Sequence, residues 1–330
     1  MEGDHNTHGA PLPPDEIANT KSKLQLNPEL FYHVDDDVIE NFRESFSYAR
    51  EEVRAWNNTL EQRMLDSSFK KDWDTAMNSE LSDIDWPSYE SGQNIATRKV
   101  WGAVIEAMAP KFKTLVGGSA DLEPSNVTAG FAKMVNDFSK DNQSGRNFAY
   151  GVREFPMGTI NNGIAQHGGL KVFGATFFVF SDYERPAIRL RALQNLPVIT
   201  EYTHDSIFVG EDGPTHQPIE HLMACRAIPN LLVLRPCDAN EAVVASRIAF
   251  EQSEYPSLVL FSRQGLPVLD RSIYPSADEF RKGAYIISDS NGDPEVSIFA
   301  SGSEVSLALE VKESLKDRVN IRVVNFGCWE

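Results

Sequence analysis

The chain has 330 residues, 41% hydrophobic and 24% charged, which is the composition of an ordinary globular protein long enough for two domains. Its net charge of −17 argues against a nucleic-acid partner, because phosphate backbones are bound by clustered lysine and arginine. No run of residues approaches the ~20 consecutive apolar residues of a membrane span, so no membrane partner is expected.

The first residues and the cysteines indicate a cytoplasmic protein. Residues 1–8 contain neither a basic region nor an apolar core, so a secretory signal is not expected. Cys225, Cys237 and Cys328 are unevenly spaced and form no CxxC pair, which argues against a disulfide framework. We therefore predict a cytoplasmic location and buried, unpaired thiols.

Residues 1–92 are acidic and have a helical pattern. Apolar side chains recur there at steps of three or four residues, with one longer gap: Val38, Phe42, Phe46, Val53, Trp56, Leu60 and Met64. Three aspartates at 35–37 precede them, where the helix dipole favours negative charge. The pattern predicts one long amphipathic helix, preceded by an extended stretch at 9–14 and followed by a linker at 82–92.

Residues 93–270 alternate short apolar runs with helical patterns. Strands are predicted at 114–116, 172–173, 198–202, 231–234 and 258–261. Helices are predicted near Arg98 and at 158–167, 183–195, 219–227 and 239–252. Such alternation is typical of a mostly parallel sheet that is flanked by helices and connected by right-handed crossovers.

Residues 271–330 begin another unit of this kind. Strands are predicted at 296–300 and 321–325, with a helix at 304–315 between them. Two strands do not make a finished sheet, so we expect a partial second α/β domain here. The predicted fold class is therefore α/β, with a helical N-terminal arm.

Polar residues follow the predicted strands of the middle region. Asp121, His204 and Arg263 each follow a strand, and the carboxyl ends of parallel strands meet at the edge where α/β sheets bind ligands. We expect this edge to hold Asp121, Ser125, His204, Asp212, His216 and Arg263. Alternatively, Asp121 and Ser125 are turn or cap residues and Arg263 is a salt-bridge partner.

The loop at 203–218 carries two histidines and three carboxylates between a strand and a helix. Imidazoles there can titrate near neutral pH, which suits an acid–base site. Alternatively, the two histidines are solvent-exposed or bind a metal, but zinc normally requires closer spacing than the twelve residues that separate His204 from His216. We predict no metal ligands in this chain.

Two further features allow either a structural or a functional interpretation. Glu154 begins a helical pattern, either as a first-turn carboxylate or as a buried carboxyl group with a proton to share. Phe177, Phe180 and Tyr183 have the spacing i, i+3, i+6, which on the start of a helix brings them near one face. They form either part of the core or a slot for a planar ring.

Taken together, these segments resemble transketolase from about residue 8 to residue 263 and beyond. The matching motifs lie at 7–12, 117–122, 124–126, 151–154, 176–183, 203–218 and 260–264. The resemblance implies a thiamin diphosphate-binding fold with a pyrimidine-binding domain at 93–270. Residues 1–92 would then belong to a diphosphate-binding domain and residues 271–330 to a C-terminal domain.

The resemblance also implies a role for each matching residue on the cofactor side. Glu154 would hydrogen-bond the pyrimidine N1′ of thiamine diphosphate and favour its imino tautomer. The other cofactor-binding residues would be Phe177, Phe180, Tyr183, Asp121, Leu122 and His8. The implied catalytic residues are Glu154, His216, His204 and His8.

The implied substrates are sugar phosphates. A two-carbon ketol group would pass from xylulose 5-phosphate to ribose 5-phosphate or erythrose 4-phosphate, in the pentose phosphate pathway. The substrate-binding residues would be His8, Arg98, Ser125, His204, Asp212, His216 and Arg263. Among them, the guanidinium groups suit phosphate geometry better than an ammonium group does.

One part of the family pattern is missing. The chain has no Gly-Asp-Gly followed about thirty residues later by Asn, the pattern that binds the diphosphate through Mg²⁺ or Ca²⁺. We therefore expect an internal piece of a transketolase, from a truncated reading frame or a split enzyme, that is inactive alone. It would act as a homodimer or with a partner chain that carries the diphosphate-binding domain. The alternatives are a dihydroxyacetone or deoxyxylulose phosphate synthase and a non-catalytic assembly module.

Overall fold

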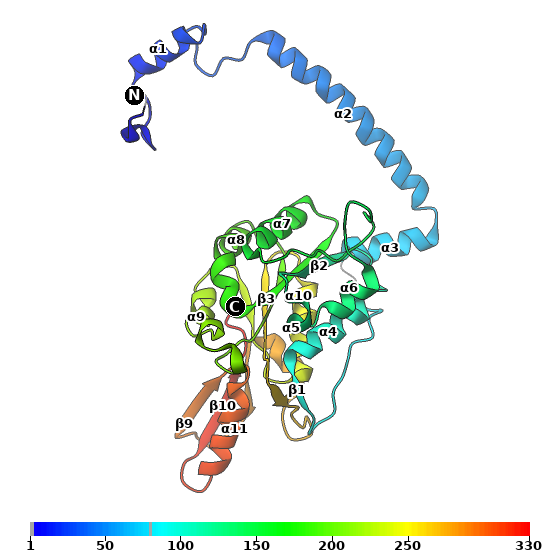
Figure 1. Cartoon of the computed structure of the whole chain (residues 1–330), viewed down its shortest axis with the longest axis vertical. Coiled ribbons are helices and arrows are strands. Elements are labelled where there is room, and N and C mark those ends of the chain that lie inside the picture. Colours follow the sequence, from blue (N-terminus) through cyan, green and yellow to red (C-terminus); the bar gives the residue numbers. More distant parts are fainter. Residues whose placement is uncertain (1–2, 79–80) are drawn as a thin grey trace. The chain divides into compact units, whose positions relative to one another are not determined.

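The computed structural model describes residues 3–78 and 81–330 (Figure 1). The chain divides into two compact units, Met1–Lys70 and Lys71–Glu330. Among the described helices, none combines the length and the apolar content that a membrane-spanning helix requires.

The first unit is helical. A short 3-10 helix, His5–Thr7, is followed by α1 (Pro14–Lys23) and α2 (Asp36–Arg63), and α3 (Ser67–Asn78) begins in this unit. Helix α2 confirms the long helix that the apolar period predicts, with Asp36 and Asp37 in its first turn. None of its residues is buried, so the apolar stripe of α2 is exposed.

The second unit is built on a sheet of five parallel strands, in the order β2-β3-β4-β6-β5. The strands are β2 (Leu115–Ser119), β3 (Lys171–Phe177), β4 (Ile199–Thr203), β6 (Ser257–Phe261) and β5 (Leu232–Leu234). Almost every residue in them is buried, because helices cover both faces. The sheet confirms the predicted α/β fold class.

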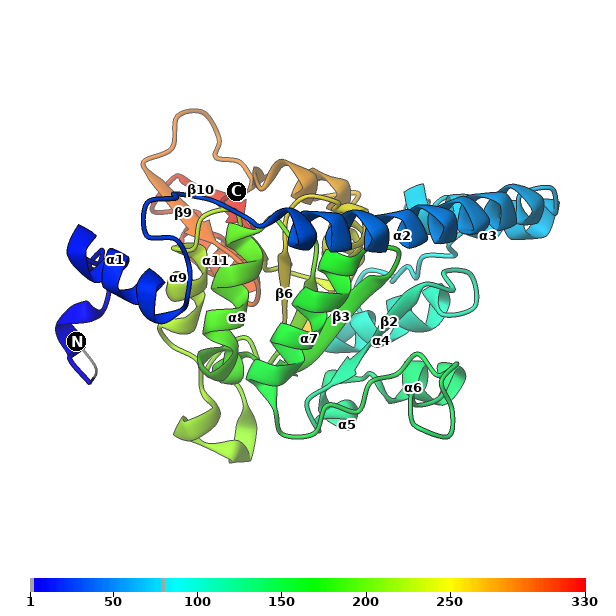
Figure 2. The same ribbon diagram turned by 90° about the horizontal axis from the view of Figure 1, so that it is seen from above.

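Different helices cover the two faces of this sheet (Figure 2). On one face, Trp101 of α4 and Phe250 of α10 pack against strand residues that include Phe173. On the other face, Ile188 of α8 packs with Tyr202. The helices of this unit are α4 (Thr97–Met108), α5 (Glu123–Asn126), α6 (Ala129–Val135), α7 (Glu154–His167), α8 (Ser181–Leu193), α9 (His221–Arg226), α10 (Ala239–Glu251) and α11 (Glu304–Leu315).

Two elements beside the carboxyl edge are longer than predicted. The helical pattern at 158–167 lacks the first turn of α7, which begins at Glu154, the residue that the sequence also indicates as a helix start. Pro156 fits this turn, because a missing N–H there breaks no helical hydrogen bond. Strand β3 extends to Phe177 rather than ending at residue 173. Gly174 suits this strand, because a Cβ there would lie 2.7 Å from Nδ2 of Asn161.

The C-terminal residues form a sheet of three strands rather than the predicted two. Its order is β8-β10-β9, with β8 (Ala284–Ser288) antiparallel to β10 (Ile321–Phe326) and β9 (Val296–Ala300) parallel to it. Tyr285 and Ile287 are the buried residues of β8, and Ile286 between them is exposed, so the sequence itself shows no apolar alternation there. A separate antiparallel pair, β1 (Asn94–Ala96) with β7 (Gly265–Pro267), is too short to show a period.

One smaller expectation, that of buried and unpaired thiols, is confirmed, and two local features complete the fold. Asp238 caps α10 by accepting a hydrogen bond from the backbone N–H of Glu241 at 2.8 Å. Cys225, Cys237 and Cys328 are buried and unpaired. The remaining short 3-10 helices are Phe178–Phe180, Gly210–Asp212, Pro214–His216 and Ala277–Lys282.

Candidate functional site

The polar residues after the strands lie at one edge of the sheet. Ser119 at the end of β2 pairs with Ala175 of β3, and Thr203 at the end of β4 pairs with both Phe177 and Phe261. The segments that follow β2, β4 and β6 therefore leave the sheet side by side, as the sequence predicts for a parallel arrangement.

A cavity of about 490 Å³ opens at this edge. The residues that line it are Ala120, Asp121, Leu122, Val152, Glu154, Phe177, Phe180, Tyr183 and His216. Ala120 and Val152 belong to the matching motifs but were not among the candidate site residues. The sequence motifs at 117–122, 151–154 and 176–183 thus meet in one concave surface.

The aromatic residues of the cavity do not all lie on a helix, contrary to expectation. Phe177 ends β3, Phe180 lies in a 3-10 helix, and only Tyr183 belongs to α8. The short turn between strand and helix places the rings of Phe177 and Phe180 nearly parallel, with centroids 5.8 Å apart and planes 10° apart. The ring of Tyr183 lies 5.9 Å from that of Phe180. The three rings form an aromatic wall.

Glu154 is both a first-turn carboxylate and a buried one. It is the first residue of α7, and only 8% of it is exposed. Burial raises the pKa of Glu154 above its ordinary value, and the nearby charge of Glu184 adds to this effect, although the backbone N–H of Glu154 opposes it. The carboxyl group therefore retains its proton at higher pH than an exposed glutamate does.

His204 does not titrate near neutral pH, contrary to expectation. It follows β4 with a φ of 64° and is 3% exposed, and its Nδ1 lies 3.2 Å from Oγ1 of Thr203. Burial, with contributions from the charges of Arg98, Arg263 and His216, lowers its pKa to about 3. The imidazole is thus a neutral hydrogen-bonding group at pH 7.

Two arginines lie near His204. Arg98 of α4 donates from Nη1 to the backbone oxygen of Ser125 at 2.8 Å, and its Nε has no hydrogen-bond partner among the described residues. Burial lowers the pKa of Arg98, and the charge of Arg263 lowers it further. Such a pair of cations favours a bound anion, and guanidinium groups match phosphate geometry.

Arg263 has a partner of its own. Its Nη2 lies 3.4 Å from Oε2 of Glu211, so the alternative interpretation as a salt-bridge residue also describes it. This pair is partly exposed and contributes little stability. Gly210 allows the approach, because a Cβ there would lie 3.0 Å from the guanidinium carbon of Arg263. The sequence does not indicate a role for Glu211.

Of the remaining candidates, His216 lines the cavity, and Asp212, Ser125 and His8 do not. Asp212 is exposed in its 3-10 helix, and Ser125 approaches Arg98 through its backbone. His216 does line the cavity, with Nδ1 2.9 Å from Oγ1 of Thr215. His8 is exposed in the separate unit Met1–Lys70, whereas the cavity is built wholly by residues of the other unit.

A buried carboxyl group lies beneath this edge, and sequence reasoning missed it. Glu201 of β4 is fully buried and accepts a hydrogen bond at 2.8 Å from Nδ2 of Asn126, which also donates to the backbone oxygen of Thr176. Burial raises the pKa of Glu201 well above its ordinary value, while the charge of Arg98 opposes this effect. The sequence signal that could have found it is a glutamate, Glu201, within a predicted strand that has no other charged residue.

Three family models match the chain. "Transketolase, pyrimidine binding domain" matches residues 93–268, "Transketolase-like TK C-terminal domain" residues 283–330, and "Transketolase, thiamine diphosphate binding domain" residues 1–81. Among curated relatives, the transketolase of Halalkalibacterium halodurans is 45% identical over 98% of this chain and 49% of its own length. That of Aquifex aeolicus is 44% identical over 98% of this chain and 47% of its own length. The chain spans about half the length of these relatives.

Solved transketolase structures are also similar to this chain. The transketolase of Leishmania mexicana superposes with a TM-score of 0.88 at 39% identity, covering 97% of this chain and 47% of that one. A Pichia stipitis transketolase in complex with sedoheptulose 7-phosphate has a TM-score of 0.88 at 36% identity, covering 98% and 49%. A split-gene transketolase, described as an inactive β4 tetramer, has a TM-score of 0.58 at 27% identity, covering 72% and 73%.

Proposed function

Because the chain belongs to the transketolase family, we propose that its cavity forms the pyrimidine side of a thiamine diphosphate site. In the whole protein, this site would transfer a two-carbon ketol group from a ketose phosphate to an aldose phosphate. The observation that carries the proposal is the position of a buried, proton-retaining Glu154 in the same cavity as the parallel rings of Phe177 and Phe180. We also propose the domain boundaries 1–92, 93–270 and 271–330.

The cavity fits a pyrimidine ring better than it fits a diphosphate. A planar heterocycle stacks on an aromatic wall, and a protonated Glu154 can donate to a ring nitrogen. Among the described lining residues there is no lysine or arginine to meet a diphosphate. We therefore assign the diphosphate, with Mg²⁺ or Ca²⁺, to a diphosphate-binding domain that faces this cavity from a second chain.

Glu154 has the main chemical role among the residues of this chain. Thiamine diphosphate, when bound, supplies the carbanion chemistry. Glu154 holds a proton at the pyrimidine N1′ position and so favours the imino tautomer. Phe177, Phe180 and Tyr183 orient the ring, while Asp121 and Leu122 close the cavity beside it.

The sugar phosphate would bind at the polar edge beside the cavity. Arg98 and Arg263 supply the positive charge for the phosphate, and a neutral His204 contributes a hydrogen bond. His216 would bond the donor's oxygens and move protons, and we assign supporting contacts to Ser125, Asp212 and His8. The complex of the Pichia stipitis relative with sedoheptulose 7-phosphate supports this substrate class. Xylulose 5-phosphate, ribose 5-phosphate and erythrose 4-phosphate are the proposed substrates.

The proposed working form is a homodimer or a complex with a partner chain in the cytoplasm, and the isolated chain would be inactive. The exposed apolar stripe of α2 and the existence of a split-gene relative support a need for further protein surface.

The test is a ketol-transfer assay with thiamine diphosphate, Mg²⁺, xylulose 5-phosphate and ribose 5-phosphate. We expect no turnover by the chain alone, and turnover after addition of a chain that carries a relative's diphosphate-binding domain. Normal turnover by the chain alone would refute the proposal that this chain forms only one side of the cofactor site. A mixture that binds thiamine diphosphate but transfers no ketol group would refute the activity.

A further inference from the structure

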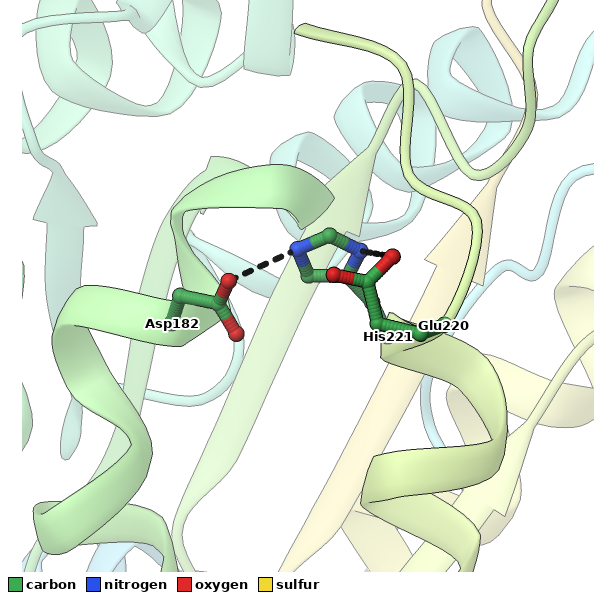
Figure 3. A group of neighbouring side chains, drawn as sticks. All are labelled: Asp182, Glu220 and His221. Carbon is green, nitrogen blue, oxygen red and sulfur yellow. Dashed lines mark hydrogen bonds and ion pairs between the residues drawn. The ribbon is translucent and has the colours of Figure 1, made fainter. Parts of the chain in front are cut away.

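A second group of potential ligands lies where α8 meets the start of α9 (Figure 3). Nε2 of His221 lies 3.1 Å from Oδ2 of Asp182, and Nδ1 of the same ring lies 3.8 Å from Oε2 of Glu220. Asp182 and the pair Glu220-His221 come from different helical segments, so their sequence spacing does not indicate a site. None of the three is needed for the proposed ketol transfer.

The hydrogen bonds of Asp182 determine the tautomer of His221. Oδ1 of Asp182 accepts from Nη2 of Arg185 at 2.8 Å, which leaves Oδ2 to accept from Nε2–H of His221. With its proton on Nε2, the imidazole carries a lone pair on Nδ1.

Nδ1 of His221 is buried and makes no hydrogen bond to the part of the chain that the structure describes. The side chain of His221 is only 5% exposed, and within residues 3–78 and 81–330 its Nδ1 has no hydrogen-bond partner. A buried acceptor in that state is unfavourable and calls for a ligand. Figure 3 shows Nδ1 facing the carboxylate of Glu220.

The separation of these two atoms suits a shared cation. Zinc bonds to nitrogen and oxygen of ~2.0–2.2 Å place two tetrahedral ligands about 3.4 Å apart. The observed 3.8 Å requires only a small rotation of Glu220, whose side chain is 74% exposed and therefore free to move. A histidine that binds a metal through one nitrogen usually donates from the other to a carboxylate, as His221 does to Asp182.

We propose that Nδ1 of His221 and the carboxylate of Glu220 bind Zn²⁺ or a similar borderline cation, with Asp182 as the supporting carboxylate and water as the remaining ligands. Imidazole nitrogen favours such ions over Mg²⁺ and Ca²⁺, which require oxygen ligands. The bound ion would join α8, which carries Tyr183, to α9, which follows the loop at 203–218. The site would exist whether or not the chain takes part in ketol transfer.

The experiment is a calorimetric titration of the metal-free chain with ZnCl₂. We expect one equivalent of zinc to be lost in His221→Ala, and binding to weaken by roughly 10–100-fold in Asp182→Asn, as for other supporting carboxylates. Glu220→Gln should weaken binding at least as much and, because Glu220 is exposed, should fold normally. The matched control is His167→Ala, an exposed histidine at the end of α7, which should bind zinc as the unchanged chain does.

Thermal unfolding provides the second readout. Zinc should raise the Tm of the unchanged chain and of His167→Ala, and at the same zinc concentration it should raise that of Glu220→Gln less. Zinc binding that is the same in His221→Ala and Glu220→Gln as in the unchanged chain would overturn the proposal, since other histidines would then account for it. Failure of the unchanged chain to bind zinc at millimolar concentration would overturn it as well.

Discussion

The ring of His204 lies against the ring of Phe177, with centroids 4.0 Å apart, at the ends of two adjacent parallel strands. The contact removes one face of the imidazole from water and adds to the burial that keeps it neutral. Positive charge at this edge of the sheet therefore comes from Arg98 and Arg263, and His204 acts through hydrogen bonds.

His204 should remain uncharged across the physiological range. Its pKa is lowered from 6.5 to about 3, so we expect its NMR signals to be constant between pH 5 and pH 8. Because the folded-state pKa is the lower one, the contribution of His204 to stability is present above pH 6.5 and is lost as the pH falls toward 3. Between these limits, the unchanged chain should lose more stability than His204→Asn. Equal losses would contradict the assignment.

Glu154→Gln should lower the activity of the reconstituted protein but should raise its thermal stability at alkaline pH. In the reconstituted protein, loss of the proton-holding carboxyl group should lower ketol transfer by about 10²–10⁴-fold. The pKa of Glu154 is raised, so its effect on folding is most favourable at low pH and is lost as the pH rises through the folded-state value. We therefore expect Glu154→Gln to have the higher Tm at pH 8 but not at pH 4. A variant with full activity would contradict the role of Glu154.

Two neighbouring phenylalanines should respond in opposite ways. Phe180 lines the cavity, so Phe180→Ala should weaken thiamine diphosphate binding to the reconstituted protein by at least the ~0.5–1.5 kcal/mol of an aromatic pair. Phe178 is 0% exposed in the core, and Phe178→Ala should cost about 3–5 kcal/mol of unfolding free energy. Fluorescence titration and urea unfolding measure the two effects. If Phe180→Ala lowered the unfolding free energy and Phe178→Ala weakened cofactor binding, Phe180 would be a core residue.

Arg263→Ala should discriminate phosphorylated from unphosphorylated sugars. A hydrogen bond to a charged group contributes about 1.5–3 kcal/mol, so in the reconstituted protein KM for ribose 5-phosphate should rise roughly 10–150-fold, while KM for unphosphorylated ribose should change little. Arg281→Ala is the matched control, because that arginine pairs with Glu251 away from the cavity. An equal effect on both sugars would indicate that Arg263 only supports the loop.

Much of the fold follows from patterns that span few residues. The apolar period of α2 and the alternation of short strands with helices predict the arm and the parallel sheet. Strand β8 and the pair of β1 with β7 were missed, because a strand of three to five residues shows little periodicity before its partner is known. Glu154 was recognised as a helix start, but the helical pattern at 158–167 omits the first turn of α7, because Pro156 interrupts the pattern although it is compatible with that turn.

The sequence by itself determined the family and the residues that meet at the sheet edge, because motifs and the succession of strands and helices can be recognised in the sequence. Only the tertiary structure decided their chemistry. His204 is neutral because folding buries it and also brings Arg98 of α4 and Arg263 after β6 near it. Glu201 is buried beneath Asn126. The lone pair of His221 is set by Asp182 of another helix. Proton affinity depends on burial and on charges within a few ångströms, and folding creates both from residues far apart in sequence.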